Sequence, residues 1–181
     1  MRLLRRGGYG LALVVITFAQ EGRKVAGSEG FELRLTAEDA TDLRATLYNR
    51  SNAARSVLKS SNLQPPSLEL VNSAGKRLKP FDERTRRKYD RSVSQGMYTR
   101  LKPGAGEVLE SGQFQKEEEG AYSLRWGPYT FREVPPGTYT ARAAFESAID
   151  WVTRDGREAP ARDAVWKGKL TSNPIEIRLP R

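Results

Sequence analysis

Basic side chains gather between Lys76 and Arg91, where eight lysine and arginine residues stand against three acidic ones in a chain of net charge +9. Aromatic residues interrupt this run, and a guanidinium beside an aromatic ring suits an anionic partner with flat groups. The segment therefore predicts contact with nucleic acid, a lipid headgroup or an anionic polymer of the cell surface. A solvated loop that only keeps the protein soluble is the alternative. The contact residues expected here are Arg84, Arg86, Arg87, Lys88 and Tyr89.

A second candidate contact surface surrounds Trp151, which Arg154 and Arg157 follow closely in the sequence. Trp and Arg contribute much of the binding energy in protein interfaces. If this segment is a loop at one end of a β-protein, these three side chains would anchor a partner there. The alternative is that Trp151 folds back and covers the edge of a sheet.

Histidine and cysteine are absent from all 181 residues. Their absence excludes Ser–His and Cys–His nucleophile pairs, imidazole or thiolate metal sites, disulfides and a lipid-modified cysteine. The carboxylates do not suggest a catalytic pair, because Glu117, Glu118 and Glu119 are adjacent in a polar turn. Gly104 and Gly106 lack the lysine of a phosphate-binding loop. We therefore expect a protein that is not an enzyme and that carries no cofactor and no metal.

The N-terminal segment has the composition of a secretory signal. Three arginines precede an apolar run from Leu11 to Ala19, and this run is too short to span a bilayer. Cleavage would follow Ala19 or Gly27, so residues 1–27 are expected to be a signal peptide or a disordered segment. A chain without cysteine suits the bacterial envelope, which predicts an exported, periplasmic or extracellular protein. The alternative is that Leu11–Phe18 is a buried strand of a cytoplasmic protein.

Alternation of apolar and polar residues predicts β-strands through the rest of the chain. The clearest case is Gly137–Leu179, where alternation at both ends predicts a closing pair of strands. Further strands are expected at 31–35, 43–47, 56–60, 67–71, 107–114, 122–126 and 129–131. Seven to nine strands and almost no helix predict an all-β fold over residues 28–181, an antiparallel two-sheet immunoglobulin-like sandwich, with a closed barrel as the alternative. Lys76–Tyr98 and Ser147–Asp163 would be its long loops, and Trp126 and Trp166 would lie in its core.

Four motifs join a strand to a turn: Leu47-Tyr-Asn-Arg-Ser51, Leu68–Gly75, Leu101-Lys-Pro-Gly104 and Val134–Tyr139. Together they resemble bacterial immunoglobulin-like domains, and their order is similar to that in the domain of the intracellular proteinase inhibitor BsuPI family. The resemblance covers about residues 43–145 and implies the fold, with proteinase inhibition as the family's activity. An N-terminal signal is a departure from an intracellular inhibitor. The first motif also fits an N-glycosylation triplet at Asn49.

These features predict a binding module of the cell envelope rather than an enzyme. Its partner would be an envelope protein or an anionic surface polymer, and we expect a monomer without a transmembrane span. Nucleic acid is not the expected partner, because export and a nucleic-acid function do not agree. The alternative function is inhibition of a proteinase through an exposed loop. Binding to a polyanion should weaken steeply with salt, whereas an inhibitor should bind through a compact and mostly neutral surface.

Overall fold

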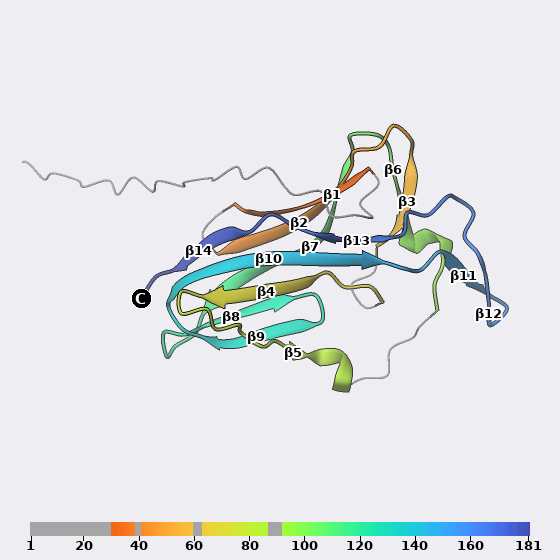
Figure 1. Cartoon of the computed structure of the whole chain (residues 1–181). Helices are drawn as coiled ribbons and strands as arrows, with labels where there is room; N and C mark the ends of the chain where they lie inside the picture. Colours follow the sequence, from red (N-terminus) through yellow and green to blue (C-terminus); the bar gives the residue numbers. More distant parts are fainter. Residues whose placement is uncertain (1–29, 39–40, 60–62, 87–91) are drawn as a thin grey trace, which may run out of the picture.

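The computed structural model describes residues 30–38, 41–59, 63–86 and 92–181, which form an all-β structure with antiparallel sheets (Figure 1). The expected N-terminal segment 1–27 and the expected contact residues Arg87, Lys88 and Tyr89 lie outside these ranges. Two short 3-10 helices, Glu83–Arg86 (η1) and Gln95–Met97 (η2), occur between strands. Within the described ranges, no helix is long and apolar enough to cross a membrane.

The larger sheet contains six strands in the order β1-β2-β7-β8-β9-β5. Their bounds are Phe31–Ala37 (β1), Asp42–Asn49 (β2), Phe81–Asp82 (β5), Gly106–Lys116 (β7), Tyr122–Trp126 (β8) and Tyr129–Val134 (β9). All neighbours in this sheet are antiparallel. A tight turn at Gly127 and Pro128 joins β8 to β9, and Gly127 supplies the positive φ of 53° found there.

The second sheet is organised around β10. Its strands are Ser67–Asn72 (β4), Gly137–Ser147 (β10), Gly168–Thr171 (β13) and Ile175–Leu179 (β14). Strand β4 pairs with one edge of β10, while β14 and β13 share the other edge, along its first and second halves respectively. The expected closing pair is therefore confirmed, with Tyr139 opposite Ile177.

Two small sheets complete the structure. They pair Arg55–Leu58 (β3) with Tyr98–Leu101 (β6), and Trp151–Arg154 (β11) with Arg157–Pro160 (β12). The described residues thus form 14 strands rather than seven to nine, and part of the expected loop Ser147–Asp163 is a hairpin. Asp155 and Gly156 make its two-residue turn, because both adopt positive φ angles of 50° and 72°. None of the sheets in the described ranges closes into a barrel, so the barrel alternative is wrong.

The two larger sheets contribute alternate side chains to one hydrophobic core. The larger sheet supplies residues such as Leu47 and Leu124, and the second sheet supplies residues such as Phe145. The core positions expected for Trp126 and Trp166 are confirmed, since these residues are 0% and 7% exposed. Apolar burial on this scale is the main favourable term in the folding free energy.

Asn49, the last residue of β2, is fully buried and hydrogen-bonded. Its side-chain Nδ2 donates to the carbonyls of Ala53 (2.8 Å) and Leu101 (2.9 Å), while Oδ1 accepts from the Ser51 amide and hydroxyl. The Gly104 N–H donates to the Asn49 carbonyl. Two sequence motifs, 47–51 and 101–104, therefore lie together. The glycosylation triplet is a structural turn instead, because a buried Nδ2 with both hydrogens engaged is inaccessible to modification.

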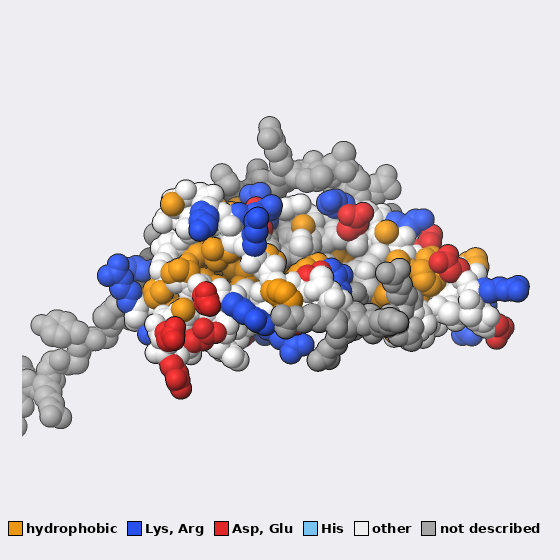
Figure 2. All heavy atoms as spheres, turned by 90° about the horizontal axis from the view of Figure 1, so that it is seen from below, with side chains coloured by type: hydrophobic (Ala, Val, Ile, Leu, Met, Phe, Trp, Pro, Cys, Tyr) orange, Lys and Arg blue, Asp and Glu red, His pale blue; other side chains and the backbone are white. Residues whose placement is uncertain are grey.

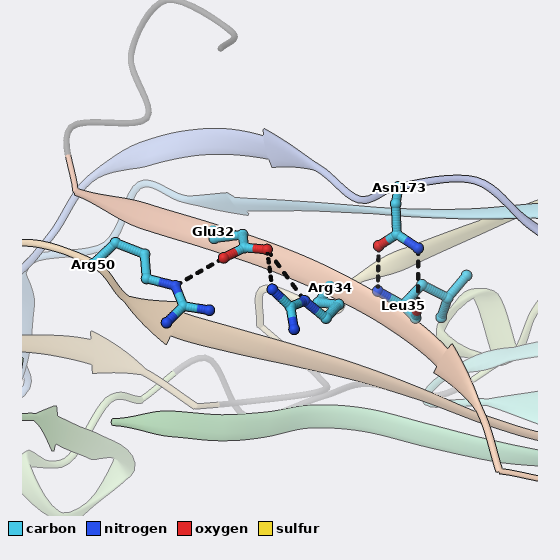
Figure 3. Close-up of polar contacts among 5 residues, drawn as sticks. All are labelled: Glu32, Arg34, Leu35, Arg50 and Asn173. Atoms are coloured by element: carbon cyan, nitrogen blue, oxygen red, sulfur yellow. Dashed lines mark hydrogen bonds and ion pairs between the residues drawn. The ribbon is translucent and has the colours of Figure 1, made fainter. Parts of the chain in front are cut away.

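The link between β13 and β14 fastens the second sheet to the edge of β1. Ser172 exchanges two hydrogen bonds with the Ala143 backbone, one through its N–H (2.8 Å) and one through its Oγ (2.9 Å). The Asn173 side chain then pairs with Leu35, accepting from its N–H (3.2 Å) and donating to its carbonyl (3.1 Å) (Figure 3). Asn173 thus takes the place of a neighbouring strand at this edge, which hinders edge-to-edge aggregation.

Candidate functional site

The β11–β12 hairpin lies at one end of the molecule, away from the C terminus (Figure 1). We call residues 151–160 and the segments that hold them the hairpin end. Thr153 anchors the hairpin to Val93, two residues after the basic segment: its N–H donates to the Val93 carbonyl (2.7 Å), and its Oγ1 accepts from the Val93 N–H (3.0 Å). Val93 is distant from the hairpin in the sequence, so this contact joins two remote parts of the chain.

Tyr98 fixes the base of the hairpin. Its Oη donates to the Trp151 carbonyl (2.7 Å), and burial, together with the nearby Asp150 carboxylate, raises the pKa of Tyr98 to about 12. The phenol therefore stays protonated and keeps this hydrogen bond across the physiological pH range. The Lys167 ammonium, 2.7 Å from Asp150, lowers the pKa of Asp150 through a hydrogen bond. Val152, between these anchors, is buried.

The three expected hairpin residues do not share one face. Arg154 and Arg157 are directly opposite each other in register and both are exposed, so the structure brings them together. Side chains alternate between the two faces of a strand, which places Trp151 on the other face with Thr153 and Glu158. Trp151 is half-buried. The exposed contact surface at this tip is therefore the arginine pair without the tryptophan.

Within the basic segment, the Arg84 side chain is bound by other residues of the protein. Its guanidinium pairs with Asp82 (2.7 Å), donates to Tyr129 Oη (3.0 Å) and lies 5.3 Å from the centre of the Tyr129 ring. The hydrogen bond from Arg84 lowers the pKa of Asp82, which keeps the pair ionised. Arg84 thus ties η1 to β9, and its charge is balanced inside the protein. Arg86 also lies in η1.

A second arginine cluster, which the residue pattern did not indicate, lies on the outer face of β1 and β2. Glu32 accepts from Arg34 and from Arg50, each at 2.8 Å (Figure 3), and both guanidiniums lie over the Tyr48 ring, 5.3 and 4.8 Å from its centre. Burial raises the pKa of Glu32, but the hydrogen bonds from both arginines outweigh it, so the pKa is lowered. Alternation along β1 predicts that Glu32 and Arg34 lie on the same face. It does not predict that Arg50 joins them, because that depends on the turn after β2.

A hydrophobic band crosses the face of the molecule seen in Figure 2, with Lys and Arg side chains beside it, a cluster of acidic side chains at one end and further acidic side chains towards the other. A cavity of about 310 Å³ lies between the turn after β4 and the start of β10, with Leu78, Pro135 and Tyr139 among its lining residues. This volume is at the lower limit for small-molecule sites. Its charged groups, Lys76 and Glu133, are exposed to solvent, so the cavity does not supply a desolvated acid–base pair.

Glu110 is a half-buried carboxyl group on β7. Its Oε1 accepts from the Ser111 N–H (3.2 Å), but its Oε2 is buried and has no hydrogen-bond partner among the described residues. Burial raises the pKa of Glu110, although the backbone N–H groups of Ser111 and Gly127 and the Arg125 charge partly oppose this. The folded protein therefore disfavours the charged carboxylate at this position.

Replacing Glu110 by Gln should increase stability at pH 7 and flatten its pH dependence. A pKa raised above its unfolded value means that this group favours folding at low pH and that the benefit is lost as pH rises through the raised pKa. The effect should be on the order of 1 kcal/mol or less, because Glu110 is partly solvated. Urea unfolding between pH 4 and pH 8 measures it. Equal pH profiles for Glu110→Gln and the unchanged protein would contradict the prediction.

Comparison of the chain with protein-family models, with curated proteins and with solved structures found no significant match to any of them.

Proposed function

We propose that the chain is a non-enzymatic binding module, exported to the bacterial cell envelope, that recognises an envelope protein or an anionic surface polymer through the hairpin end. One observation carries this proposal: the exposed arginine pair, Arg154 and Arg157, stands on a hairpin whose base is fixed by Tyr98 and Val93. A rigid support lowers the entropy lost when a partner binds. Export is supported by the basic and apolar N-terminal sequence.

The finer fold assignment within this proposal is an immunoglobulin-like sandwich similar to the BsuPI-type domain. It is supported by two antiparallel sheets that share one core and by the contact of the motifs 47–51 and 101–104 at Asn49. Recognition at the end of such a domain is common, because the loops gather there while the sheets form a rigid scaffold.

Photo-crosslinking tests the proposed function. A photoreactive residue in place of Glu158, which leaves both arginines of the pair intact, should capture a partner from the envelope fraction of the native cell, whereas the same residue in place of Arg142 should not. Arg142 is a suitable control because it is also exposed but lies on β10, outside the hairpin. Equal capture at both positions, or a full-length protein found only in the cytoplasm by fractionation and intact mass, would contradict the proposal.

Inhibition of a proteinase is the second candidate function. The observation that favours it is the tight two-residue turn at Asp155 and Gly156, exposed at the tip of an anchored hairpin. A protruding rigid loop of this kind fits an enzyme cleft with little loss of conformational entropy. A panel of purified proteinases tests it: inhibition that persists at high salt supports the inhibitor, and uninhibited proteinases at micromolar concentrations of the protein exclude those enzymes as targets.

A further inference from the structure

We propose that Arg154 and Arg157 together bind the phosphate of a phosphomonoester. This inference rests on the proposed function and names the chemistry that the hairpin end recognises. The geometry supplies the first argument. The two residues are cross-strand neighbours that flank a two-residue turn, so their side chains leave the same face of the hairpin. Cβ atoms of such pairs are about 5 Å apart, which lets two guanidiniums converge on one small anion.

The charges around the pair supply the second argument, because other described arginines without an ion pair, such as Arg142 and Arg178, do not lie opposite a second arginine. Seven described arginines form an ion pair with a carboxylate: Arg34, Arg44, Arg50, Arg77, Arg84, Arg100 and Arg132. Within the described part of the chain, no carboxylate forms an ion pair with Arg154 or Arg157. Asp155 lies in the turn between them, and Glu158 is on the opposite face of the hairpin.

Two arginines placed opposite each other in this way cost folding free energy. Like charges directly opposite each other in a sheet repel, and neither side chain is needed to bury the hairpin, because Val152 does this from the same face. An anion between the guanidiniums would remove the repulsion. Binding should therefore also raise the thermal stability of the protein, since a ligand that binds only the folded state stabilises it.

Charge and donor geometry favour a phosphomonoester over a carboxylate. The pair carries two positive charges, and a phosphomonoester carries about −1.5 to −2 at neutral pH. One guanidinium already saturates the two oxygens of a carboxylate in a bidentate pair, whereas the three terminal oxygens of a phosphomonoester can accept from both guanidiniums. The phosphate could belong to a soluble or polymeric sugar phosphate or to a lipid headgroup, and the experiment below separates these sources.

NMR titration of the full chain with inorganic phosphate and with glucose 6-phosphate tests the inference. Amide signals of residues 152–158 should shift and saturate. The double variant Arg154→Ala/Arg157→Ala should weaken binding at least about tenfold, because each charged hydrogen bond contributes on that scale. The matched control, Arg142→Ala/Arg178→Ala, removes two exposed arginines that form no ion pair in the described chain, and it should change the affinity less than about twofold. Equal weakening in both variants, or no shift at the hairpin, overturns the inference.

Vesicle sedimentation identifies the source of the phosphate. Binding to phosphatidylcholine vesicles that contain phosphatidic acid, lost in the Arg154→Ala/Arg157→Ala variant, supports the inference with a lipid source. Binding of soluble phosphates alone supports it with a soluble or polymeric source. If the photoreactive residue at position 158 captures an envelope protein while no phosphate probe binds, the inference fails and the proposed function stands. If phosphate binds but no partner is captured, the inference stands and the proposed function fails.

Discussion

Replacing Asn49 by Ala should lower the free energy of unfolding by about 3 kcal/mol, because it removes the hydrogen bonds of a fully buried amide, including the one to the carbonyl of buried Leu101. In the native protein the Asn49 amide donates to the Leu101 and Ala53 carbonyls, and Leu101 is only 3% exposed. The change also removes the acceptor that orders Ser51. A loss of this size should lower Tm by roughly 6–12 °C in a domain of this length.

The neighbouring residue Asn52 offers a matched control for this change. Asn52 is also an asparagine and lies in the same turn, but it is exposed and no hydrogen bond of its side chain is found among the described residues. Asn52→Ala should change stability by less than about 0.5 kcal/mol. Calorimetry or urea unfolding of both variants measures the difference. Similar stabilities for Asn49→Ala and Asn52→Ala would show that Asn49 does not hold the two motifs together.

The sequence was most informative where one face of a strand is buried and the other is solvated. Alternation in the segments that became β1, β2 and β10 correctly predicted which side chains face the core, because a strand repeats every two residues. The buried positions of Trp126 and Trp166 also followed from local pattern and side-chain size. These predictions depend on residues close together in the chain.

Features that depend on distant residues could not be predicted in the same way. The edge of β10 is shared by β14 and β13 because Ser172 continues the hydrogen bonding between them, and no local pattern reports this. The hairpin at Asp155–Gly156 had a local turn signal, but its strands carry charged residues instead of regular alternation, so they resembled a loop.

The candidate site shows the same division. Residue type alone suggested Trp151, Arg154 and Arg157 as contact residues. The strand register shows that the tryptophan lies on one face of the hairpin and the two arginines on the other. It also suggested that Arg84 is available to a partner, whereas Asp82 and Tyr129 engage it within the protein. Composition therefore indicates which residues can bind an anion, but only the ion pairs in the folded structure show which arginines are already engaged.

Replacing Gly112 by Ala should be among the most damaging single changes, lowering stability by about 3 kcal/mol or more through overpacking. A Cβ atom at this position on β7 would collide with the Arg125 carbonyl oxygen on the neighbouring strand. It would also lie 2.9 Å from Leu124 Cδ1 and 3.3 Å from the Trp126 ring. Side chains can change rotamer, but the carbonyl belongs to the β8 backbone, so relief would require the two strands to separate locally.

Gly75→Ala provides the control, because glycine is favoured at this position by a positive φ angle and not by lack of space. Its φ is +76°, but a Cβ there would meet nothing within 4 Å. Gly75→Ala should therefore cost only the strain of a left-handed residue, about 1–2 kcal/mol, whereas Gly112→Ala should cost more without any unusual φ. If urea unfolding ranks Gly75→Ala as the more damaging change, the approach of β7 to β8 at Gly112 must be looser than the structure indicates. If Gly112→Ala is the less stable protein, close contact between strand backbones, and not chain conformation, explains why glycine occupies this position.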